Sequence, residues 1–230
     1  MIIGGLQKAT LIDYPGKIAC VVFTIGCNMR CGFCYNTKLV NPTHPIEEHM
    51  SVADFFKFLD KRKGLLDAVT VSGGEPTLHK DLGEFIAEIK KRGFLVKLDT
   101  QGSKPDHVRE LLQQGNIDYV AMDVKAPLHR YSEVSNADHD TKLILESMEI
   151  IRTLAPDYEF RTTVVADQLD ENDIHEIGKL VKGAKRHYLQ KYVPSVTNDL
   201  TFLDRVPYDD TTMEELRNIM ATYVTEAFVR

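Results

Sequence analysis

The sequence lacks the features that mark membrane, secreted and nucleic-acid-binding proteins. No apolar run approaches the roughly 18 residues that a membrane-spanning helix needs, and the first residues show neither a charged start nor a long apolar stretch with a cleavage site. Acidic residues outnumber basic ones by 34 to 28, which gives a net charge of −6, and the basic residues form no long block. A nucleic-acid-binding surface is usually basic. We therefore expect a protein of the cytoplasm, with neither a membrane nor a nucleic acid as its partner.

Cysteine is also scarce, and its distribution is uneven. The chain has four cysteines, Cys20, Cys27, Cys31 and Cys34, and none follows them. A disulfide framework would spread its cysteines over distant loops of a small secreted domain. Tight clustering in a chain without secretion signals indicates a metal site instead.

Short apolar runs alternate with helical patterns along the 230 residues. The runs are rich in Val, Ile, Phe, Tyr and Leu, as is typical of buried parallel strands. The expected strands are Ile18–Thr24, Ala68–Ser72, Phe94–Asp99, Tyr119–Asp123, Glu159–Val165 and His187–Val193. The expected helices are Val52–Lys63, Leu82–Arg92, one that begins at Pro105 and ends before Gly115, Thr141–Leu154, Glu171–Lys182, and a last one from Thr211 towards Phe228.

This alternation predicts an α/β fold. Successive strand–helix units form a parallel sheet with right-handed crossovers, and a full barrel needs about eight of them. We therefore expect a partial, open (β/α)6 barrel with mainly parallel strands. It should form one domain over residues 1–230, with a core of about residues 18–193 and a C-terminal helical extension of about residues 211–228. In this architecture the chemistry lies at the C-terminal ends of the strands.

Three of the cysteines follow the first expected strand with the spacing C-x3-C-x2-C. They lie in the segment Gly26–Asn36, which we call the cysteine loop. Thiolates on one short loop can converge on one ion or cluster, and a [4Fe–4S] cluster normally has four such ligands. Three local ligands would leave one iron open for chemistry. The alternative is a structural zinc site with Cys20, His44 or His49 as fourth ligand, although no second zinc knuckle is present. Cys20 itself lies within the strand, where a free cysteine usually behaves as a small buried hydrophobe.

At these residues the sequence resembles the radical S-adenosylmethionine (SAM) superfamily, whose signature is C-x3-C-x-aromatic-C, with Phe33 in the aromatic position. The resemblance implies that Cys27, Cys31 and Cys34 hold a [4Fe–4S] cluster, and that the partial barrel is of the radical SAM type. It also implies that the methionyl amine and carboxylate of SAM chelate the open iron. Reductive cleavage of SAM then releases methionine and a 5′-deoxyadenosyl radical, and the protein supplies position and exclusion of water.

The segment Ser72-Gly73-Gly74-Glu75-Pro76 follows the second expected strand. By itself a Gly-Gly pair most often marks a tight turn. One strand–helix unit after the cysteine loop, it resembles the GGEP motif of the family, which binds the methionyl amine of SAM. A carboxylate such as Glu75 suits a cationic amine, and Gly73 and Gly74 allow close backbone approach.

Asp99 and Thr100 end the third expected strand, and Asp123 and Lys125 stand at the end of the fourth. Such residues often cap a following helix. They also resemble positions of glycyl-radical activating enzymes whose equivalents of Asp99, Thr100 and Asp123 gather a small cation beside SAM. Oxygen ligands suit a hard cation, monovalent or divalent. The equivalent of Lys125 lies in the same site.

Three further residues complete the site that the resemblance implies. Arg161, within the fifth expected strand, is similar to the arginine that reaches the SAM carboxylate, and an unpaired charge there would be costly. Gln190 occupies a similar place on the sixth expected strand, although a buried Gln more commonly satisfies backbone groups. Tyr35 stands where many relatives carry His, at a position that flanks the adenine.

The segment from Leu11 to Lys17, read together with these motifs, resembles the activating proteins of anaerobic ribonucleoside-triphosphate reductase. These activators abstract a hydrogen atom from a backbone glycine of the reductase, and the resemblance implies a flavodoxin- or ferredoxin-type electron donor. Two alternatives stay open. One is a radical SAM enzyme acting on a small molecule, such as a 7-deazaguanine-forming synthase, and the other is a non-catalytic iron–sulfur or zinc protein.

Overall fold

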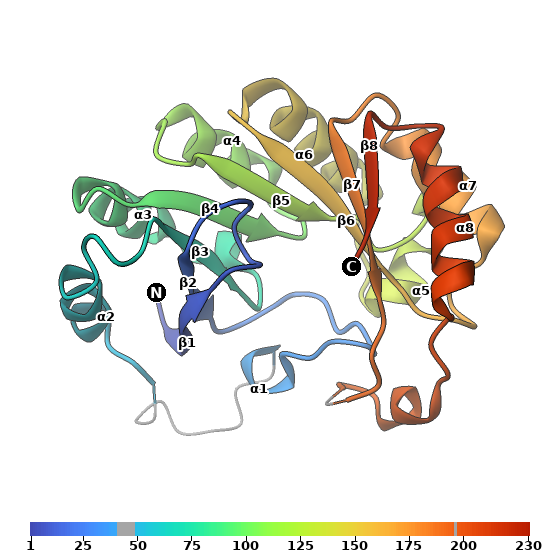
Figure 1. Ribbon diagram of the computed structural model, residues 1–230, viewed down its shortest axis with the longest axis horizontal. Helices are drawn as coiled ribbons and strands as arrows, with labels where there is room; N and C mark the ends of the chain where they lie inside the picture. The colour runs from blue at the N-terminus through green and yellow to red at the C-terminus, as the bar shows by residue number, and fades with distance from the viewer. Residues whose placement is uncertain (41–48, 196) are drawn as a thin grey trace.

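A computed structural model describes residues 1–40, 49–195 and 197–230 and places eight strands in one sheet. The strands are β1 Ile3–Thr10, β2 Ala19–Thr24, β3 Ala68–Gly73, β4 Leu95–Thr100, β5 Tyr119–Asp123, β6 Tyr158–Val164, β7 Arg186–Lys191 and β8 Glu226–Val229. Each pairs with the next along the chain; β1 is antiparallel to β2, and all other pairs are parallel. Within the described residues no pairing joins β8 to β1, so the curved sheet is an open barrel (Figure 1).

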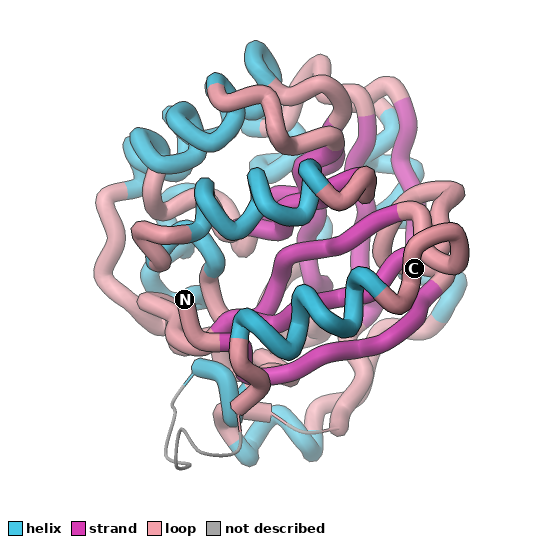
Figure 2. Tube along the Cα trace, turned by 90° about the vertical axis from the view of Figure 1, so that its left-hand side faces the viewer, coloured by secondary structure: helices cyan, strands magenta, loops and turns pink. Residues whose placement is uncertain are grey.

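The helices are α1 Thr37–Val40, α2 Val52–Asp60, α3 Leu82–Lys91, α4 Pro105–Gln113, α5 Tyr131–Ser135, α6 Thr141–Leu154, α7 Glu171–Leu180 and α8 Asp210–Ala221, with the 3-10 turns η2 Pro76–Leu78, η3 Leu128–Arg130 and η4 Leu200–Asp204. Helices α2, α3, α4, α6, α7 and α8 cover the outer side of the sheet (Figures 1 and 2), whereas α1 and α5 lie at the strand ends. None of the helices described is both long and apolar enough to cross a bilayer.

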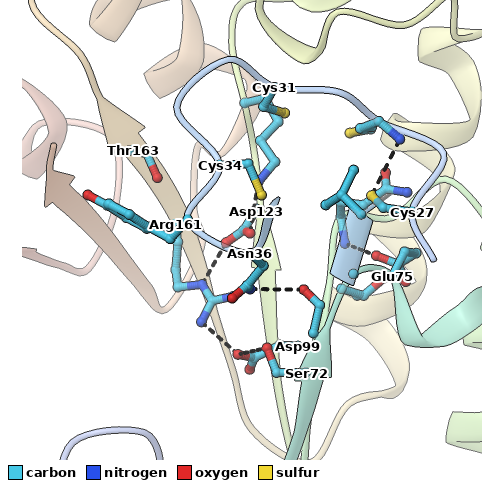
Figure 3. Close-up of a pocket in the computed structure, with 18 of the residues that line it drawn as sticks. Cys27, Cys31, Cys34, Asn36, Ser72, Glu75, Asp99, Asp123, Arg161 and Thr163 are labelled. Atoms are coloured by element: carbon cyan, nitrogen blue, oxygen red, sulfur yellow. Dashed lines mark hydrogen bonds and ion pairs between the residues drawn. The ribbon is translucent and has the colours of Figure 1, made fainter. Parts of the chain in front are cut away.

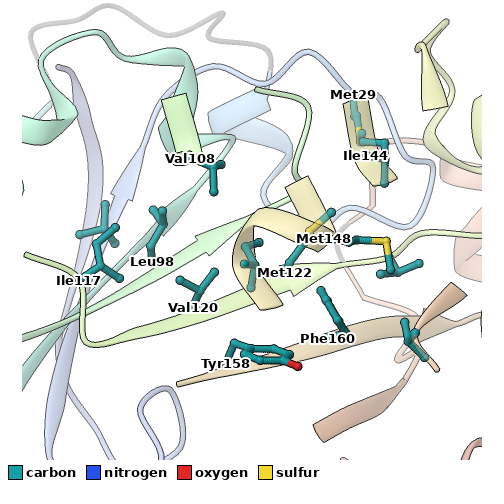
Figure 4. Close-up of a cluster of buried hydrophobic side chains, with 14 of the residues drawn as sticks. Met29, Leu98, Val108, Ile117, Val120, Met122, Ile144, Met148, Tyr158 and Phe160 are labelled. Atoms are coloured by element: carbon teal, nitrogen blue, oxygen red, sulfur yellow. The ribbon is translucent and has the colours of Figure 1, made fainter. Parts of the chain in front are cut away.

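The main core lies between the sheet and these helices. Figure 4 shows part of it: Leu98, Val120, Met122 and Phe160 of the sheet, and Val108, Ile144 and Met148 of α4 and α6. Burying one such side chain contributes about 1.5–3 kcal/mol, so this interface holds the helices on the sheet. The sequence of α3 explains both its packing and its end. Its buried residues recur with helical spacing, so they form one face that packs on the sheet. Gly93 at φ +90° provides the left-handed turn that ends the helix.

The inner face of the sheet has a second, smaller cluster. Ala19, Ala68, Tyr14 and Tyr119 pack together near the N-terminal ends of the strands, with the two tyrosine ring centroids 5.8 Å apart. The small alanine side chains leave room for these rings, which fill the barrel interior near the N-terminal ends of the strands. The C-terminal ends of the strands are left for polar side chains.

The predicted fold class is confirmed, with two corrections to its extent. The expected strands correspond to β2–β7, but β1 and β8 extend the sheet at its two edges. The Gly4-Gly5 pair makes β1 a poor strand by propensity, and its pairing with β2 stabilises it. The predicted helical extension over residues 211–228 is wrong beyond Ala221, since β8 occupies Glu226–Val229.

A local cause explains where α8 ends. The run from Thr222 to Thr225 contains three β-branched residues, which are poor helix formers. Phe228 then stacks on Tyr188 of β7, with ring centroids 4.8 Å apart. At the other end, the Asp209 side chain accepts a hydrogen bond from the N–H of Thr212, so the helix begins earlier than expected.

Candidate active site

A cavity of about 340 Å³ opens at the C-terminal ends of the parallel strands (Figure 3). Every residue predicted to contact a cofactor lines it: Cys27, Cys31, Phe33, Cys34, Tyr35, Gly73, Gly74, Glu75, Asp99, Thr100, Asp123, Lys125, Arg161 and Gln190. The structure therefore brings together side chains from the cysteine loop and from the ends of β3, β4, β5, β6 and β7.

The sequence analysis missed other residues that line the same cavity. They are Asp13, Met29, Asn36, Val40, Ser72, Gln101 and Thr163. Asn36 donates from Nδ2 to the carbonyl oxygen of Gly73 at 3.1 Å, and thereby ties the end of the cysteine loop to β3. Its place two residues after the last cysteine is a signal that could have identified it.

The cysteine loop packs directly on the Gly-Gly pair after β3. The N–H of Glu75 donates to the carbonyl oxygen of Gly26 at 2.8 Å, and the N–H of Gly74 donates to that of Thr24 at 2.9 Å. A Cβ atom on Gly74 would lie 2.1 Å from the Gly26 oxygen, and one on Gly73 would lie 2.2 Å from the Thr24 nitrogen. Both glycines are therefore required by the contact between two backbone segments.

The loop is supported on its outer side by the segment around η4. Asn198 donates to the carbonyl oxygen of Cys31 at 3.3 Å, and the N–H of Asp199 donates to that of Gly32 at 3.1 Å. Phe202 lies against Phe33, and a Cβ atom on Gly32 would lie 2.3 Å from the Phe202 ring. Glycine at position 32 thus lets this ring close over the loop.

The donor set fits an iron–sulfur cluster better than a single ion. Cys27, Cys31 and Cys34 all line the cavity, whereas Cys20 is fully buried in the helix-covered core on the other side of β2. Among the residues that the structure describes, no three His, Cys, Asp or Glu side chains lie close enough together to hold one metal ion. A cubane accepts one thiolate at each of several separate irons. His44, named above as a zinc ligand, lies outside the described residues.

Burial raises the pKa of all three loop thiols, and that of Cys31 to about 11. The Lys125 ammonium acts in the opposite direction on each of them. Ligation of iron needs the thiolate form, so the loop releases protons when it binds a cluster. Lys125 is the cation placed to favour that form.

The Glu75 carboxylate is 1% exposed and joins the ends of β3 and β4. Oε1 accepts from the Thr77 N–H at 3.1 Å, the Thr77 hydroxyl at 2.5 Å and the Thr100 hydroxyl at 2.7 Å, and Oε2 accepts from the Gln101 N–H at 2.8 Å. Burial raises its pKa, and these donors oppose the shift. A carboxylate has about four acceptor positions, so protein donors take up both positions on Oε1 and one on Oε2.

Five charged side chains form what we call the charge row: Lys97, Asp99, Arg161, Asp123 and Lys125. Lys97 Nζ lies 2.7 Å from Asp99 Oδ1, and Arg161 Nη1 lies 3.1 Å from Asp99 Oδ2. Arg161 Nε lies 2.7 Å from Asp123 Oδ1, and Lys125 Nζ lies 2.9 Å from Asp123 Oδ2. The Arg161 guanidinium bridges the two carboxylates (Figure 3).

The charge row keeps both carboxylates ionised. Burial raises the pKa of Asp99, but Arg161 and Lys97 outweigh it and hold this pKa below its usual value. Arg161 and Lys125 do the same for the pKa of Asp123. Lys97 was not predicted, although its position two residues before Asp99 in a strand places both side chains on one face of the sheet.

Tyr35 links the cysteine loop to the segment after β7. Its hydroxyl accepts from the N–H of Val193 at 2.9 Å, and its ring stacks on Tyr192 with centroids 6.3 Å apart. The side chain is 45% exposed, so one face of the ring borders the mouth of the cavity. Gln190 pairs in register with Thr163 on the neighbouring strand, and both line the same cavity as Tyr35.

Known proteins share this sequence and architecture. The family model of the radical SAM superfamily matches residues 21–181. A Methanocaldococcus jannaschii protein assigned to the glycyl-radical enzyme activating enzymes is 34% identical over 237 residues, covering all of this chain and 95% of the relative. The pyruvate formate-lyase-activating enzyme of Staphylococcus aureus is 34% identical over 132 residues, which are 52% of this chain and 51% of that enzyme.

A solved structure has the same fold. Streptococcus suis SuiB bound to S-adenosylmethionine superposes with a TM-score of 0.71 at 16% identity, over 91% of this chain and 49% of SuiB, so this chain spans about half of that protein. By the match of its family model and its full-length relative, the chain belongs to the radical SAM superfamily and, within it, to the glycyl-radical activating enzymes, whose cofactors are a [4Fe–4S] cluster and SAM.

Proposed function

We propose that this chain, acting as one domain in the cytoplasm, installs a glycyl radical on anaerobic ribonucleoside-triphosphate reductase. The observation that supports it is the cavity itself, where every residue predicted from the resemblance comes together at the strand ends. Asp13, from the N-terminal segment that resembles the reductase activators, lines the same cavity. A flavodoxin- or ferredoxin-type protein would supply the electron.

When bound, the cluster and SAM supply the 5′-deoxyadenosyl radical by reductive cleavage of the sulfonium. In our proposal Cys27, Cys31 and Cys34, which line the cavity, would hold the cluster through three of its irons and leave one iron for SAM. Lys125 and Arg161 each have N–H groups beyond those that bind the aspartates, and they attract the SAM carboxylate.

The contact with the methionyl amine is assigned differently from the sequence-based expectation. The Glu75 side chain already accepts from four protein donors, so we assign the amine to the backbone around Gly73 and Gly74, which lines the cavity. Glu75 then acts as a positioning residue that fixes the two strand ends. Phe33 and Tyr35 are the aromatic rings available to the adenine.

The open side of the barrel supports a polypeptide as the substrate. A second cavity of about 420 Å³ adjoins the first, and the two share Asp13, Tyr35, Arg161, Thr163 and Gln190. It is bordered by Ile12 on the β1–β2 connection and by Lys191 and Arg230 next to β7 and β8. A loop of a partner protein can reach the site through this opening without any strand pair being broken.

The direct test mixes the reconstituted protein with SAM, a reductant and the reductase in the absence of oxygen. We expect a doublet EPR signal on the reductase, and no signal from a reductase in which the target glycine is replaced by alanine. A Cys34→Ala variant serves as the matched control without a cluster. If the signal is absent while a small pterin is consumed, the synthase alternative replaces this proposal.

A further inference from the structure

The resemblance predicts that Asp99, Thr100 and Asp123 gather a small cation beside SAM, yet protein donors already occupy these groups. Asp99 Oδ1 is bound by Lys97 at 2.7 Å, and Asp99 Oδ2 by Arg161 at 3.1 Å and Ser72 at 3.2 Å. The Thr100 hydroxyl donates to Glu75 and accepts from the N–H of Gly102 at 3.1 Å.

Protein donors also occupy the carboxylate oxygens of Asp123. Its two oxygens are bound by Arg161 at 2.7 Å and by Lys125 at 2.9 Å. Each carboxylate oxygen of the pair therefore has an ammonium or guanidinium partner from this chain. A metal ion would have to displace at least two of these contacts to gain the oxygen ligands that a hard cation requires.

The charge balance leads to the same conclusion. The charge row contains three cations and two anions, so it carries one positive charge before any ion is added. Lys97, Asp99 and Arg161 are buried, and a further cation would place a second unbalanced charge beside them. The carboxylate of SAM, by contrast, would neutralise the existing charge.

Lys97 supplies the excess positive charge of the charge row. It is 2% exposed, it comes from within β4, and its Nζ lies 2.7 Å from Asp99 Oδ1. Without Lys97 the row would have two cations and two anions, and Asp99 Oδ1 would lack its ammonium. The position of a lysine two residues before Asp99 thus decides whether an ion is needed.

We infer that Lys97, with Arg161 bridging the aspartates, takes the place of the small cation, so that this chain binds SAM independently of Na⁺ and K⁺. The inference rests on the proposed placement of SAM in this cavity. Lys97 acts through Asp99 and is a positioning residue. It fixes the carboxylate that holds Arg161 in place.

The test measures SAM binding to the anaerobic, cluster-loaded protein without a reductant, so no turnover is involved. The dissociation constant is determined in choline chloride and in NaCl or KCl at the same ionic strength, about 100 mM, so that screening is constant. For the wild-type protein we expect values equal within about twofold, a difference below 0.5 kcal/mol. A tightening of about tenfold or more by either ion would overturn the inference.

The Lys97→Met variant makes the test sharper. It should bind SAM about tenfold more weakly in choline chloride, because removing one partner of a buried pair leaves Asp99 undercompensated. Na⁺ or K⁺ should then restore much of the affinity, while Lys57→Met, at an exposed lysine of α2, should behave like the wild type.

Two further measurements bear on the cation site and on the placement of SAM. If Lys97→Met does not fold, the wild-type titration decides alone, together with crystals soaked in Tl⁺. Anomalous density between Asp99 and Asp123 would overturn the inference. A wild-type protein that binds no SAM in any salt would refute the placement of SAM itself, and is thereby distinct from a protein that binds SAM only with K⁺.

Discussion

The Gln101 side chain donates from Nε2 to Oδ1 of Asn28 at 2.8 Å, and so joins the end of β4 to the cysteine loop. The backbone N–H of Gln101 donates to the Glu75 carboxylate. One residue therefore connects the loop, β4 and the segment after β3. A substitution of Glu75 should therefore alter the position of the cysteine loop, even though Glu75 is not a ligand of the cluster.

Replacing Glu75 with alanine should retain the iron but abolish SAM cleavage. The change leaves buried donors on Thr77, Thr100 and Gln101 without their acceptor, and we expect the free energy of unfolding to fall by about 3 kcal/mol. Chemical denaturation, iron content and 5′-deoxyadenosine formation are the measurements. Glu84→Ala, at an exposed site of α3, should change none of them, and cleavage at the wild-type rate in Glu75→Ala would contradict our assignment.

The three loop cysteines should behave alike, and differently from Cys20. Anaerobic reconstitution of the wild type should give about four irons and four sulfides per chain. Alanine at position 27, 31 or 34 should abolish this uptake, while Cys20→Ala should retain it because Cys20 packs in the helix-covered core. Iron and sulfide analysis decides the matter, and one tightly bound zinc with no iron would end the cluster interpretation.

Gly32→Ala should loosen the cysteine loop through Phe202. The added methyl group would lie 2.3 Å from that ring, and overpacking of this kind costs about 1–3 kcal/mol. We expect lower stability and faster loss of iron on exposure to a chelator. Adding Phe202→Leu should restore part of the stability and part of the iron retention, because residues 32 and 202 contact each other. If the double variant shows the plain sum of the single effects, the contact is not the cause.

Much of the fold could be predicted because its signals are local. The apolar runs of β2–β7 and the cysteine spacing each lie within a few residues, so sequence alone reveals them. The ends of the sheet could not be predicted in this way: β8 has four residues, and its stability comes from pairing with β7 and from the stack of Phe228 on Tyr188.

The same distinction applies to the site. Motifs pointed to its lining residues, but the partners of each side chain depend on strand register. Arg161 of β6 reaches Asp99 of β4 and Asp123 of β5 only because these three strands pair as they do. The donors to Glu75 come from two different strand ends, so its set of hydrogen bonds could not be foreseen from the GGEP motif alone.

His187 should make the stability of the cluster-free protein fall in mild acid. It is fully buried, and burial lowers its pKa from about 6.5 to about 3, so the unfolded chain binds a proton there that the native chain excludes. Its stabilising contribution is present above pH 6.5 and is lost as the pH falls from that value towards 3. Between about pH 7 and pH 5 the loss should be about 2 kcal/mol.

Urea denaturation at the two pH values, for the wild type and His187→Gln, checks this prediction. Glutamine does not titrate, so the variant should lose less stability between the two pH values, by about 2 kcal/mol. Equal losses in both proteins would show that His187 is already charged in the native state.

The support of the cysteine loop by the segment around η4 has a consequence for how the chain matures. Each strand pairs with its neighbour in sequence, so the sheet can grow in the order in which the ribosome releases it. The contact between Asn198 and Cys31, however, spans 167 positions. The loop emerges early and acquires its final shape only after Asn198 has been made. Cluster delivery to a nascent chain that lacks this segment should therefore be unproductive, which makes loading a late step in the maturation of the chain.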